Sequence, residues 1–234
     1  MRQIKIMFSY YGSKSKIVQY YPSPTHDKII EPFAGSARYS EMYWDTPDIL
    51  LMDKYQVIVD VWHYLQMASE KDILGLPSQP EKYLSKEENY LIGYCISRGS
   101  ASPKIKPQKY NSWDKDKVRI ANSIYKIKHW KIIQGSYEDI ENENATWFID
   151  PPYQFGGQHY KEPNKNIDFN LLANWCKSRL GQVIVCENTK ANWMDFKPII
   201  QIQGTLQTFT TEAIWTNFKT QYDSVQQELF SWVG

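Results

Sequence analysis

The sequence predicts a single α/β domain in which a mixed sheet carries helices on both faces, with a small, mainly helical insert. Two observations predict this fold. Through most of the chain, short apolar runs that end at Gly, Pro or polar residues alternate with helix-length amphipathic segments, the pattern of βα units on a parallel sheet. The last apolar runs lack such helices between them, so we expect the sheet to finish with antiparallel strands. With 234 residues, the chain is long enough for one sizeable core.

Composition limits the function classes only partly. The net charge of +1 gives no global preference for an acidic partner, and the nine Trp and 17 Tyr suit both core packing and base stacking. Three cysteines, Cys95, Cys176 and Cys186, show no metal-ligand spacing, so we expect reduced, buried thiols, no bound metal and a cytoplasmic protein. No stretch approaches the ~20 apolar residues of a membrane span, so we expect no membrane partner.

The first half of the chain predicts two βα units. The first strand ends at a proline, and the small-residue turn 34–37 that follows leads into a helix. Gly35 in this turn lets a ligand approach the backbone closely. The expected elements are, in order, a helix over 14–20, a strand over 28–33, a helix over 38–44, a strand over 49–53 and a helix over 56–66.

Two segments of this half have a candidate ligand role. The Gly-Ser turn within residues 8–17 precedes a helix and contains two lysines, so it can present backbone N–H groups and a lysine to an anion. A surface loop with solvated lysines is the alternative. Asp53 ends the second strand 20 residues after Phe33, where an acid suits the hydroxyl pair of a ribose. It can also cap the helix over 56–66, and the two roles are compatible.

The pattern loosens from residue 70 to about residue 111. We assign residues 70–125 to the insert, while 1–69 and 126–234 form the main domain. Residues 98–131 contain ten Lys or Arg and two acids, in a chain of net charge +1. This asymmetry predicts a surface that faces nucleic acid, and the alternative is a solvated surface that happens to be basic. The expected elements are a linker over 74–80, a helix over 87–96, a basic loop over 98–111 and a helix over 113–128.

Two strands of the second half end at polar residues on the presumed ligand edge. The strand over 130–134 stops at Gly135, and the strand over 147–149 stops at Asp150. The Gly-containing loop that follows the latter, with Tyr160 and Lys161, is a candidate lid. The remaining expected elements are a helix over 169–180 and strands over 182–186, 199–203, 212–215 and 227–232.

The stretch from Trp147 to Tyr153 carries the clearest chemistry. Its two prolines end a buried strand, so the Asp150 carboxylate is expected at the sheet edge, near the fixed carbonyl of Pro151. Two acceptors at one point suit an exocyclic amino group, and holding both its hydrogens makes the nitrogen lone pair more nucleophilic. Tyr153 offers a ring for stacking. The alternative is a rigid Pro-Pro turn with an exposed acid.

Four segments follow one another along the chain: Tyr10-Tyr-Gly-Ser-Lys14, Glu31-Pro-Phe-Ala-Gly-Ser36, Gly135-Ser-Tyr-Glu-Asp139 and Asp150-Pro-Pro-Tyr153. In type and order they resemble the motifs of the Dam-type (D12 class, alpha group) DNA N6-adenine methyltransferases. That family has W-A-G-G-K, F-x-G-x-G and D-P-P-Y motifs, and its recognition insert varies. The resemblance covers most of the chain except roughly residues 70–125. It implies a Rossmann-like methyltransferase fold, with the insert as target-recognition region.

The resemblance implies transfer of a methyl group from S-adenosylmethionine to the N6 amino group of adenine in DNA, which leaves S-adenosylhomocysteine. The base would be flipped out of the duplex. Asp150 and the Pro151 carbonyl would hold its amino group and Tyr153 would stack on it, so the implied catalytic residues are Asp150, Pro151, Pro152 and Tyr153. The methyl group would pass in line to nitrogen without a metal or a covalent enzyme intermediate.

The implied binding residues divide between cofactor and DNA. Phe33 and Gly35 would shape the cofactor pocket, Asp53 would bind the ribose and Tyr137 would lie near the adenine ring. The cofactor set is Tyr10, Gly12, Lys14, Glu31, Phe33, Ala34, Gly35, Ser36, Asp53, Ser136, Tyr137 and Asp150. The DNA set, chiefly for phosphates, is Arg98, Lys104, Lys106, Lys109 and Arg119. The partner would be double-stranded DNA in the nucleoid of a prokaryote, or of a phage-infected cell, and a companion restriction endonuclease is compatible.

The sequence departs from the family pattern in places. Ala37 replaces the second glycine of F-x-G-x-G, and an alanine fits there if its φ is negative. Tyr10, Tyr11 and Ser13 replace Trp, Ala and Gly of the N-terminal motif, which bears on the shape of that loop. Two alternatives stay open: methylation of another amino group, such as cytosine N4 or one on RNA or protein, and a nucleic-acid-binding module with a decayed active site. The motifs give neither the recognition sequence nor the oligomeric state.

Overall fold

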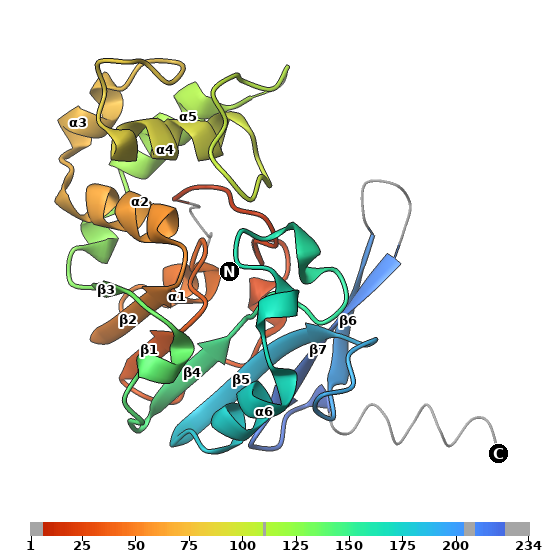
Figure 1. Ribbon diagram of the computed structural model, residues 1–234. Helices are drawn as coiled ribbons and strands as arrows, with labels where there is room; N and C mark the ends of the chain where they lie inside the picture. Colours follow the sequence, from red (N-terminus) through yellow and green to blue (C-terminus); the bar gives the residue numbers. More distant parts are fainter. Residues whose placement is uncertain (1–6, 110, 204–208, 223–234) are drawn as a thin grey trace.

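The computed structural model describes residues 7–109, 111–203 and 209–222, which form an α/β fold around a mixed sheet. In this part of the chain the sheet has seven strands, in the order β3-β2-β1-β4-β5-β7-β6 (Figure 1). The strand expected over 227–232 lies outside the described residues. The strands are β1 (Lys28–Glu31), β2 (Asp48–Asp53), β3 (Lys131–Gln134), β4 (Ala145–Ile149), β5 (Gly181–Asn188), β6 (Lys197–Gln203) and β7 (Phe209–Thr216).

The pairing directions divide the sheet into two parts. β1 pairs in parallel with β2 and β4, β2 with β3, and β4 with β5. β7 is antiparallel to both β5 and β6, so the expected antiparallel finish is confirmed. The strand order reverses between β1 and β4. At such a point the carboxyl ends of the strands leave a crevice, which is where open α/β sheets bind ligands.

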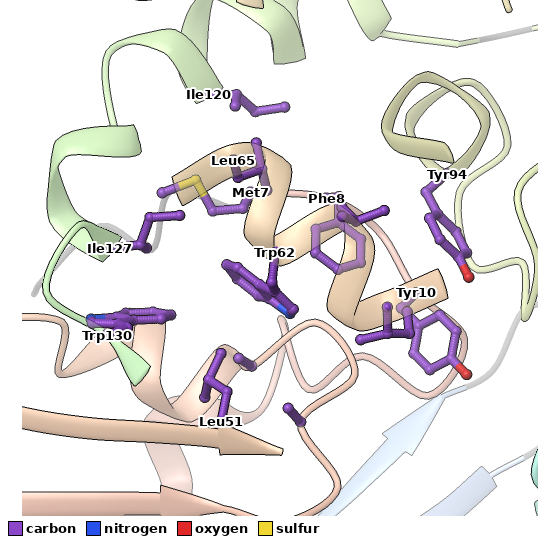
Figure 2. Close-up of a cluster of buried hydrophobic side chains, with 14 of the residues drawn as sticks. Met7, Phe8, Tyr10, Leu51, Trp62, Leu65, Tyr94, Ile120, Ile127 and Trp130 are labelled. Atoms are coloured by element: carbon purple, nitrogen blue, oxygen red, sulfur yellow. The ribbon is translucent and has the colours of Figure 1, made fainter. Parts of the chain in front are cut away.

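Helices cover both faces of the sheet because successive strand residues point to opposite sides. Ile29 of β1 packs into the core under α2, whereas Ile30 packs into the core under α6. Figure 2 shows the first of these cores, where Trp62 of α2 lies among side chains from several segments. The α-helices are α1 (Arg38–Met42), α2 (Gln56–Met67), α3 (Glu70–Gly75), α4 (Lys86–Ile96), α5 (Trp113–Ala121) and α6 (Phe169–Lys177).

The insert is a helical layer on the α2 side of the sheet (Figure 1). Its helices α3 and α4 both contact α5 directly, and α4 also contacts α2. Each of α3 and α4 begins with a capping box, at Ser69 and Ser85 respectively. The basic loop after α4 folds back on that helix. The Lys104 N–H donates to the Gly93 carbonyl (3.2 Å), and a Cβ on Gly93 would lie 2.7 Å from Pro103, so a glycine is required there.

Two expected helices and one expected linker differ from the sequence prediction. In place of a helix over 14–20, a turn on the Lys14 carbonyl leads into the short 3-10 helix η1 (Val18–Tyr20). The helix expected over 113–128 stops at Ala121 and resumes as the 3-10 helix η2 (Ile124–Ile127), because Asn122 and Ser123 close the first helix with i→i+3 and i→i+4 bonds. α3 occupies part of the expected linker, and the capping box at Ser69 starts it.

Candidate active site

The carboxyl ends of β1, β2, β3 and β4 surround a cavity of about 220 Å³. Four segments far apart in the sequence reach it: residues 10–14, the turn after β1, the 3-10 helix η3 (Tyr137–Asp139) and the loop after β4. The structure therefore brings the sequence-predicted cofactor residues together. The twelve that line this cavity are Tyr10, Gly12, Lys14, Glu31, Phe33, Ala34, Gly35, Ser36, Asp53, Ser136, Tyr137 and Asp150.

The turn after β1 is held by Asp53 at the end of β2. The two Asp53 oxygens accept the Gly35 N–H and the Tyr55 N–H, each at 2.8 Å. The N-cap of α2 is Tyr55, so Asp53 supports the start of that helix from two residues earlier. Burial raises the pKa of Asp53 to about 6. On the other side of the turn, the Trp62 indole N–H donates to the Gly35 carbonyl (2.9 Å) and fixes its backbone.

Ala37 closes this turn in the left-handed region, with φ 42° and ψ 49°. The condition under which an alanine fits there, a negative φ, is therefore not met. The backbone keeps the conformation that a glycine would adopt with less strain, because the chain must reverse between β1 and α1 within a few residues. The Glu41 N–H donates to the Ala37 carbonyl (2.9 Å), so α1 begins directly after it.

Glu31 is a buried carboxylate at the cavity floor, with 2% of its surface exposed. The Ser40 N–H of α1 donates to its Oε1 (2.6 Å). Burial raises its pKa to about 8, and the nearby Asp150 carboxylate adds to this shift. A carboxyl group in this state gains from a cationic ligand, since a positive charge nearby favours its ionised form.

Aromatic rings form one wall of the cavity. Phe33 and Tyr137 lie with ring centroids 5.4 Å apart and planes at 31°, and Tyr137 meets Trp175 of α6 edge-on. Ser136 caps η3 through the Asp139 carboxylate. The flat faces of Phe33 and Tyr137 suit a planar ligand ring.

Asp150 follows β4 and lies beside Lys14 at the cavity floor. The Lys14 Nζ is 2.8 Å from the Asp150 Oδ1, and only 18% of the Asp150 side chain is exposed. Burial raises the pKa of Asp150 to about 6 although Lys14 acts against this shift. Burial alone lowers the pKa of Lys14, but Asp150 and Glu212 outweigh it and raise that pKa. The acid therefore faces the cavity instead of forming an exposed turn.

The other catalytic candidates take different positions. Pro152 lines the cavity, whereas Pro151 is buried and is not among the lining residues. The Tyr153 hydroxyl donates to Glu212, and the Lys14 Nζ lies 4.4 Å from the Tyr153 ring centroid. Tyr153 is thus fixed at both its ring and its hydroxyl.

The loop after β4 covers the N-terminal segment, as expected for a lid. Tyr160 contacts the rings of Tyr10 and Tyr11, with centroids 6.0 and 5.0 Å apart. Gly12 has φ 73°, and a Cβ there would lie 1.8 Å from the Tyr160 hydroxyl. Lys161, the other residue expected in this lid, is exposed and does not line the cavity.

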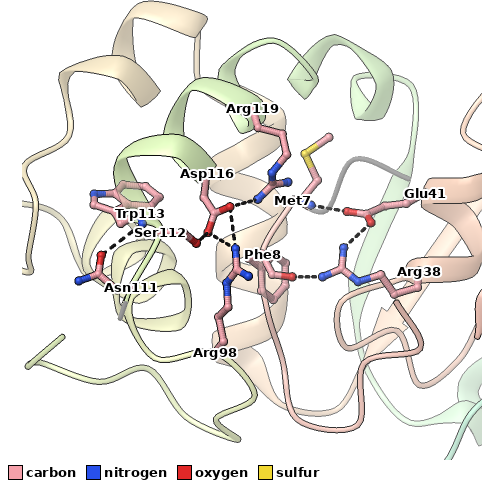
Figure 3. Close-up of polar contacts among 10 residues, drawn as sticks. All are labelled: Met7, Phe8, Arg38, Glu41, Arg98, Asn111, Ser112, Trp113, Asp116 and Arg119. Atoms are coloured by element: carbon pink, nitrogen blue, oxygen red, sulfur yellow. Dashed lines mark hydrogen bonds and ion pairs between the residues drawn. The ribbon is translucent and has the colours of Figure 1, made fainter. Parts of the chain in front are cut away.

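Arg38 at the start of α1 holds the N-terminal segment in place (Figure 3). This buried guanidinium donates to the Phe8 carbonyl, to Glu41 and to the Ser13 hydroxyl. Glu41 also accepts the Met7 N–H (2.6 Å). Residues 7–13 therefore have a fixed path into the cavity, and the sequence analysis missed Arg38, which showed there only as a basic residue in the first turn of a helix.

The basic residues of the insert do not form one uniform surface. Asp116 of α5 accepts hydrogen bonds from both Arg98 and Arg119, so these two expected DNA contacts are tied to the protein (Figure 3). The Arg98 side chain still has 56% of its surface exposed. Lys104, Lys106 and Lys109 are exposed on the loop between α4 and α5.

Glu212 of β7 is the second residue that the sequence analysis missed. It is buried, accepts the hydroxyls of Tyr21 (2.6 Å) and Tyr153, and lies 3.8 Å from the Lys14 Nζ. In the sequence, Glu212 was only the first residue of the strand expected over 212–215. The structure places it in the middle of β7 (Phe209–Thr216), where an acid is unusual without a partner.

Within the described ranges, no group of His, Cys, Asp and Glu side chains could hold a metal ion, and no helix has the length and apolarity for a membrane span. The three cysteines are free and buried. No protein-family model matches the chain, and a search of curated proteins finds no significant match.

Proposed function

We propose that this chain is an S-adenosylmethionine-dependent DNA methyltransferase that acts on the N6 amino group of adenine and has the Rossmann-like methyltransferase fold. The observation that carries the proposal is the convergence of four separate motifs on one cavity, with Asp150 at its floor. The parallel part of the sheet supports it as well, because its order β3-β2-β1-β4-β5 places this cavity at the strand-order reversal.

The cavity suits the charge of S-adenosylmethionine. Six carboxylates and three basic side chains line it, so a ligand with a sulfonium and an ammonium group finds a net negative environment. Each Asp53 oxygen accepts one N–H and keeps a lone pair for a ribose hydroxyl. Phe33 and Tyr137 provide flat surfaces for the adenine ring.

S-adenosylmethionine, when bound, would supply an electrophilic methyl carbon to the amine nitrogen, and the C–S bonding electrons would remain with sulfur. The Asp150 carboxylate, which lines the cavity, would hold the amino group so that the nitrogen lone pair is turned toward the methyl group. The second acceptor expected from the sequence, the Pro151 carbonyl, belongs to a residue that does not line the cavity. Nitrogen gains a positive charge on transfer and then loses one proton. The Asp150 carboxylate accepts that proton, and its pKa of about 6 keeps it mostly ionised at neutral pH.

The insert, residues 70–125, is proposed as the DNA-binding region. Lys104, Lys106 and Lys109 lie exposed on one loop and suit contacts with phosphates, and Arg98 adds an exposed charge beside them. This loop is tied to the cavity wall, because the Tyr11 N–H donates to the Ser100 carbonyl (3.2 Å) and the Gly99 N–H donates to the Ser9 hydroxyl (2.9 Å).

The test is to incubate the protein with methyl-labelled S-adenosylmethionine and unmethylated double-stranded DNA, and then digest the DNA to nucleosides. We expect label in N6-methyldeoxyadenosine. Label in N4-methyldeoxycytidine would change the substrate, and cofactor binding by calorimetry without any transfer would indicate a decayed enzyme. Single-stranded RNA and a protein mixture serve as substrate controls.

A further inference from the structure

A buried carboxylate from the antiparallel end of the sheet reaches the proposed reaction centre. Glu212 lies in the middle of β7, opposite Asn188 of β5 and Ile200 of β6, and 5% of its surface is exposed. Its Oε1 accepts hydrogen bonds from the hydroxyls of Tyr21 and Tyr153. Nothing in the proposed reaction so far requires this acid.

Glu212 and Asp150 share a single lysine. The Lys14 Nζ lies 2.8 Å from the Asp150 Oδ1 and 3.8 Å from the Glu212 Oε1. With both acids ionised, these three buried groups carry one net negative charge. The lysine therefore cannot neutralise Asp150 completely, since Glu212 competes for it.

We propose that Glu212 is a positioning residue for the methyl transfer: it shares Lys14 with Asp150 and fixes the ring of Tyr153 through its hydroxyl. This inference rests on the proposed function. A net negative cluster favours the transition state, in which positive charge moves from sulfur onto the amine nitrogen beside Asp150. Glu212 also fixes the Tyr153 ring through its hydroxyl, with the Lys14 Nζ 4.4 Å from the ring centroid.

The removal of this charge has a defined effect on Asp150. Glu212 raises the pKa of Asp150, burial being the larger cause and Lys14 the opposing one. Without the Glu212 charge, Lys14 pairs with Asp150 alone, so the pKa of Asp150 falls. The charged and titratable groups around Asp150 are Lys14 and Tyr160 of the cavity wall, Tyr21, Glu31 of β1, Tyr153, Cys186 and Glu187 of β5, and Glu212 of β7.

The experiment compares wild type with Glu212→Gln. Glutamine keeps an oxygen acceptor for the two tyrosine hydroxyls, so the fold and the cofactor affinity should hold while the charge is lost. We expect the single-turnover rate of methyl transfer to fall by roughly tenfold or more. The acid limb of its pH profile should move down by about one pH unit, because Asp150 stays ionised to lower pH. Glu143→Gln, at the other end of β4, is the control for loss of a carboxylate.

A second pair of variants separates the two roles of Glu212. Tyr153→Phe keeps the ring but removes the bond to Glu212, so it should lower the rate. It also removes a hydroxyl that lowers the pKa of Asp150, so its acid limb should move up, opposite to that of Glu212→Gln. In Glu212→Gln with Tyr153→Phe, the acid limb should lie below that of Tyr153→Phe alone, because loss of the Glu212 charge lowers the pKa of Asp150 in either background. An acid limb that stays in place in Glu212→Gln would overturn the sharing of Lys14. A rate loss explained wholly by weaker cofactor binding or a lower Tm would overturn the positioning role.

One readout does not depend on catalysis. Carbon-13 labelling of aspartate carboxyl groups reports the pKa of Asp150 by NMR in the ligand-free protein, with Asp150→Asn to assign the signal. We expect that pKa to be lower in Glu212→Gln than in wild type, and an unchanged value would overturn the inference. If the NMR pKa shifts but wild type transfers no methyl group to DNA, the proposed function is the part that fails, and the catalytic role of Glu212 fails with it.

Discussion

The cavity and the insert differ in the sign and the exposure of their charged side chains. At the cavity floor, Glu31 and Asp150 are buried or nearly so, and burial raises the pKa of each. On the insert, Lys104 and Lys106 are exposed, and the buried acid Asp116 binds two arginines. The net charge of +1 thus conceals an acidic interior site and a basic outer surface.

The difference teaches how each region can bind. Folding has already removed water from buried carboxylates before a ligand binds. A small cation that binds beside them therefore gains a strong and directional interaction. Exposed lysines keep their water and bind a polyanion by releasing its counterions, which makes the binding sensitive to salt. The two regions should therefore respond differently to mutation, pH and salt.

The largest effect should follow loss of the central carboxylate. Asp150→Ala should lower the rate of methyl transfer by roughly 10³-fold or more, because nothing else holds the amino group and accepts its proton. Binding of S-adenosylmethionine, measured by calorimetry, should stay within a few-fold of wild type. Asp195→Ala, an exposed pair partner of Lys197, is the control. Methylation at the wild-type rate in Asp150→Ala would contradict the catalytic role assigned to the buried acid of the cavity.

The basic side of the comparison is tested by Lys104→Glu with Lys106→Glu. We expect DNA affinity at low salt to fall by roughly 10 to 100-fold. The slope of log K against log salt should become shallower by the amount that about two phosphate contacts contribute. Fluorescence anisotropy over a salt series measures both. Lys177→Glu on α6, which lies on the other face of the sheet, should change neither. An unaltered slope in the double variant would remove this loop from the interface.

Gly12→Ala tests how closely the lid covers the cavity. The new methyl group would overlap the Tyr160 hydroxyl in a backbone with φ 73°, so the lid must move. We expect cofactor binding to weaken by roughly 1–3 kcal/mol. Tyr160→Ala in the same chain should restore part of this loss, whereas DNA binding should not change. Equal losses with and without Tyr160 would mean that backbone strain alone is responsible.

Glu31 tests the acidic cavity through pH. Its pKa of about 8 in the folded protein exceeds the value of about 4.3 for an unfolded chain, so the folded state holds the proton more tightly. Stability from this group is present below pH 4.3 and is lost as pH rises through about 8. The free energy of unfolding of the wild type should therefore fall by roughly 2–4 kcal/mol between pH 5 and 9 through this group, and Glu31→Gln should not show this fall. Denaturant unfolding over that pH range measures both. Glu141→Gln, an exposed acid, is the control.

The smallest effect concerns the strained turn. Ala37→Gly should raise the free energy of unfolding by about 0.5–1 kcal/mol, since a glycine adopts a positive φ more readily. Ala34→Gly in the same turn, which has no positive φ, should lower stability by a similar amount. Thermal melts of the two variants measure this contrast. A loss of stability in Ala37→Gly would contradict the assignment of strain.

The sequence predicted the elements that local chemistry determines. Prolines end both β1 and β4 as expected in kind, since a missing N–H stops a strand regardless of what lies nearby. β4 ends at Ile149 as predicted, whereas β1 ends at Glu31, two residues before the predicted end of the strand over 28–33. Nine of the twelve cofactor candidates lie at or just after the ends of parallel strands, whose carboxyl ends share an edge, and the other three come from residues 10–14. The acid at Asp150 was visible for the same reason, whereas its pairing with Lys14 emerged only in the structure.

Tertiary structure decided what depends on distant partners. Glu212 and Arg38 gain their roles only when β7 and α1 pack beside the N-terminal segment, 191 residues separating Tyr21 from its acid. Asp116 turned two expected DNA contacts into internal pairs, and the reversal between β1 and α1 forced Ala37 into a positive φ. Periodicity and spacing describe neighbours along the chain, whereas charge pairing and backbone strain are set by the residues that folding brings together.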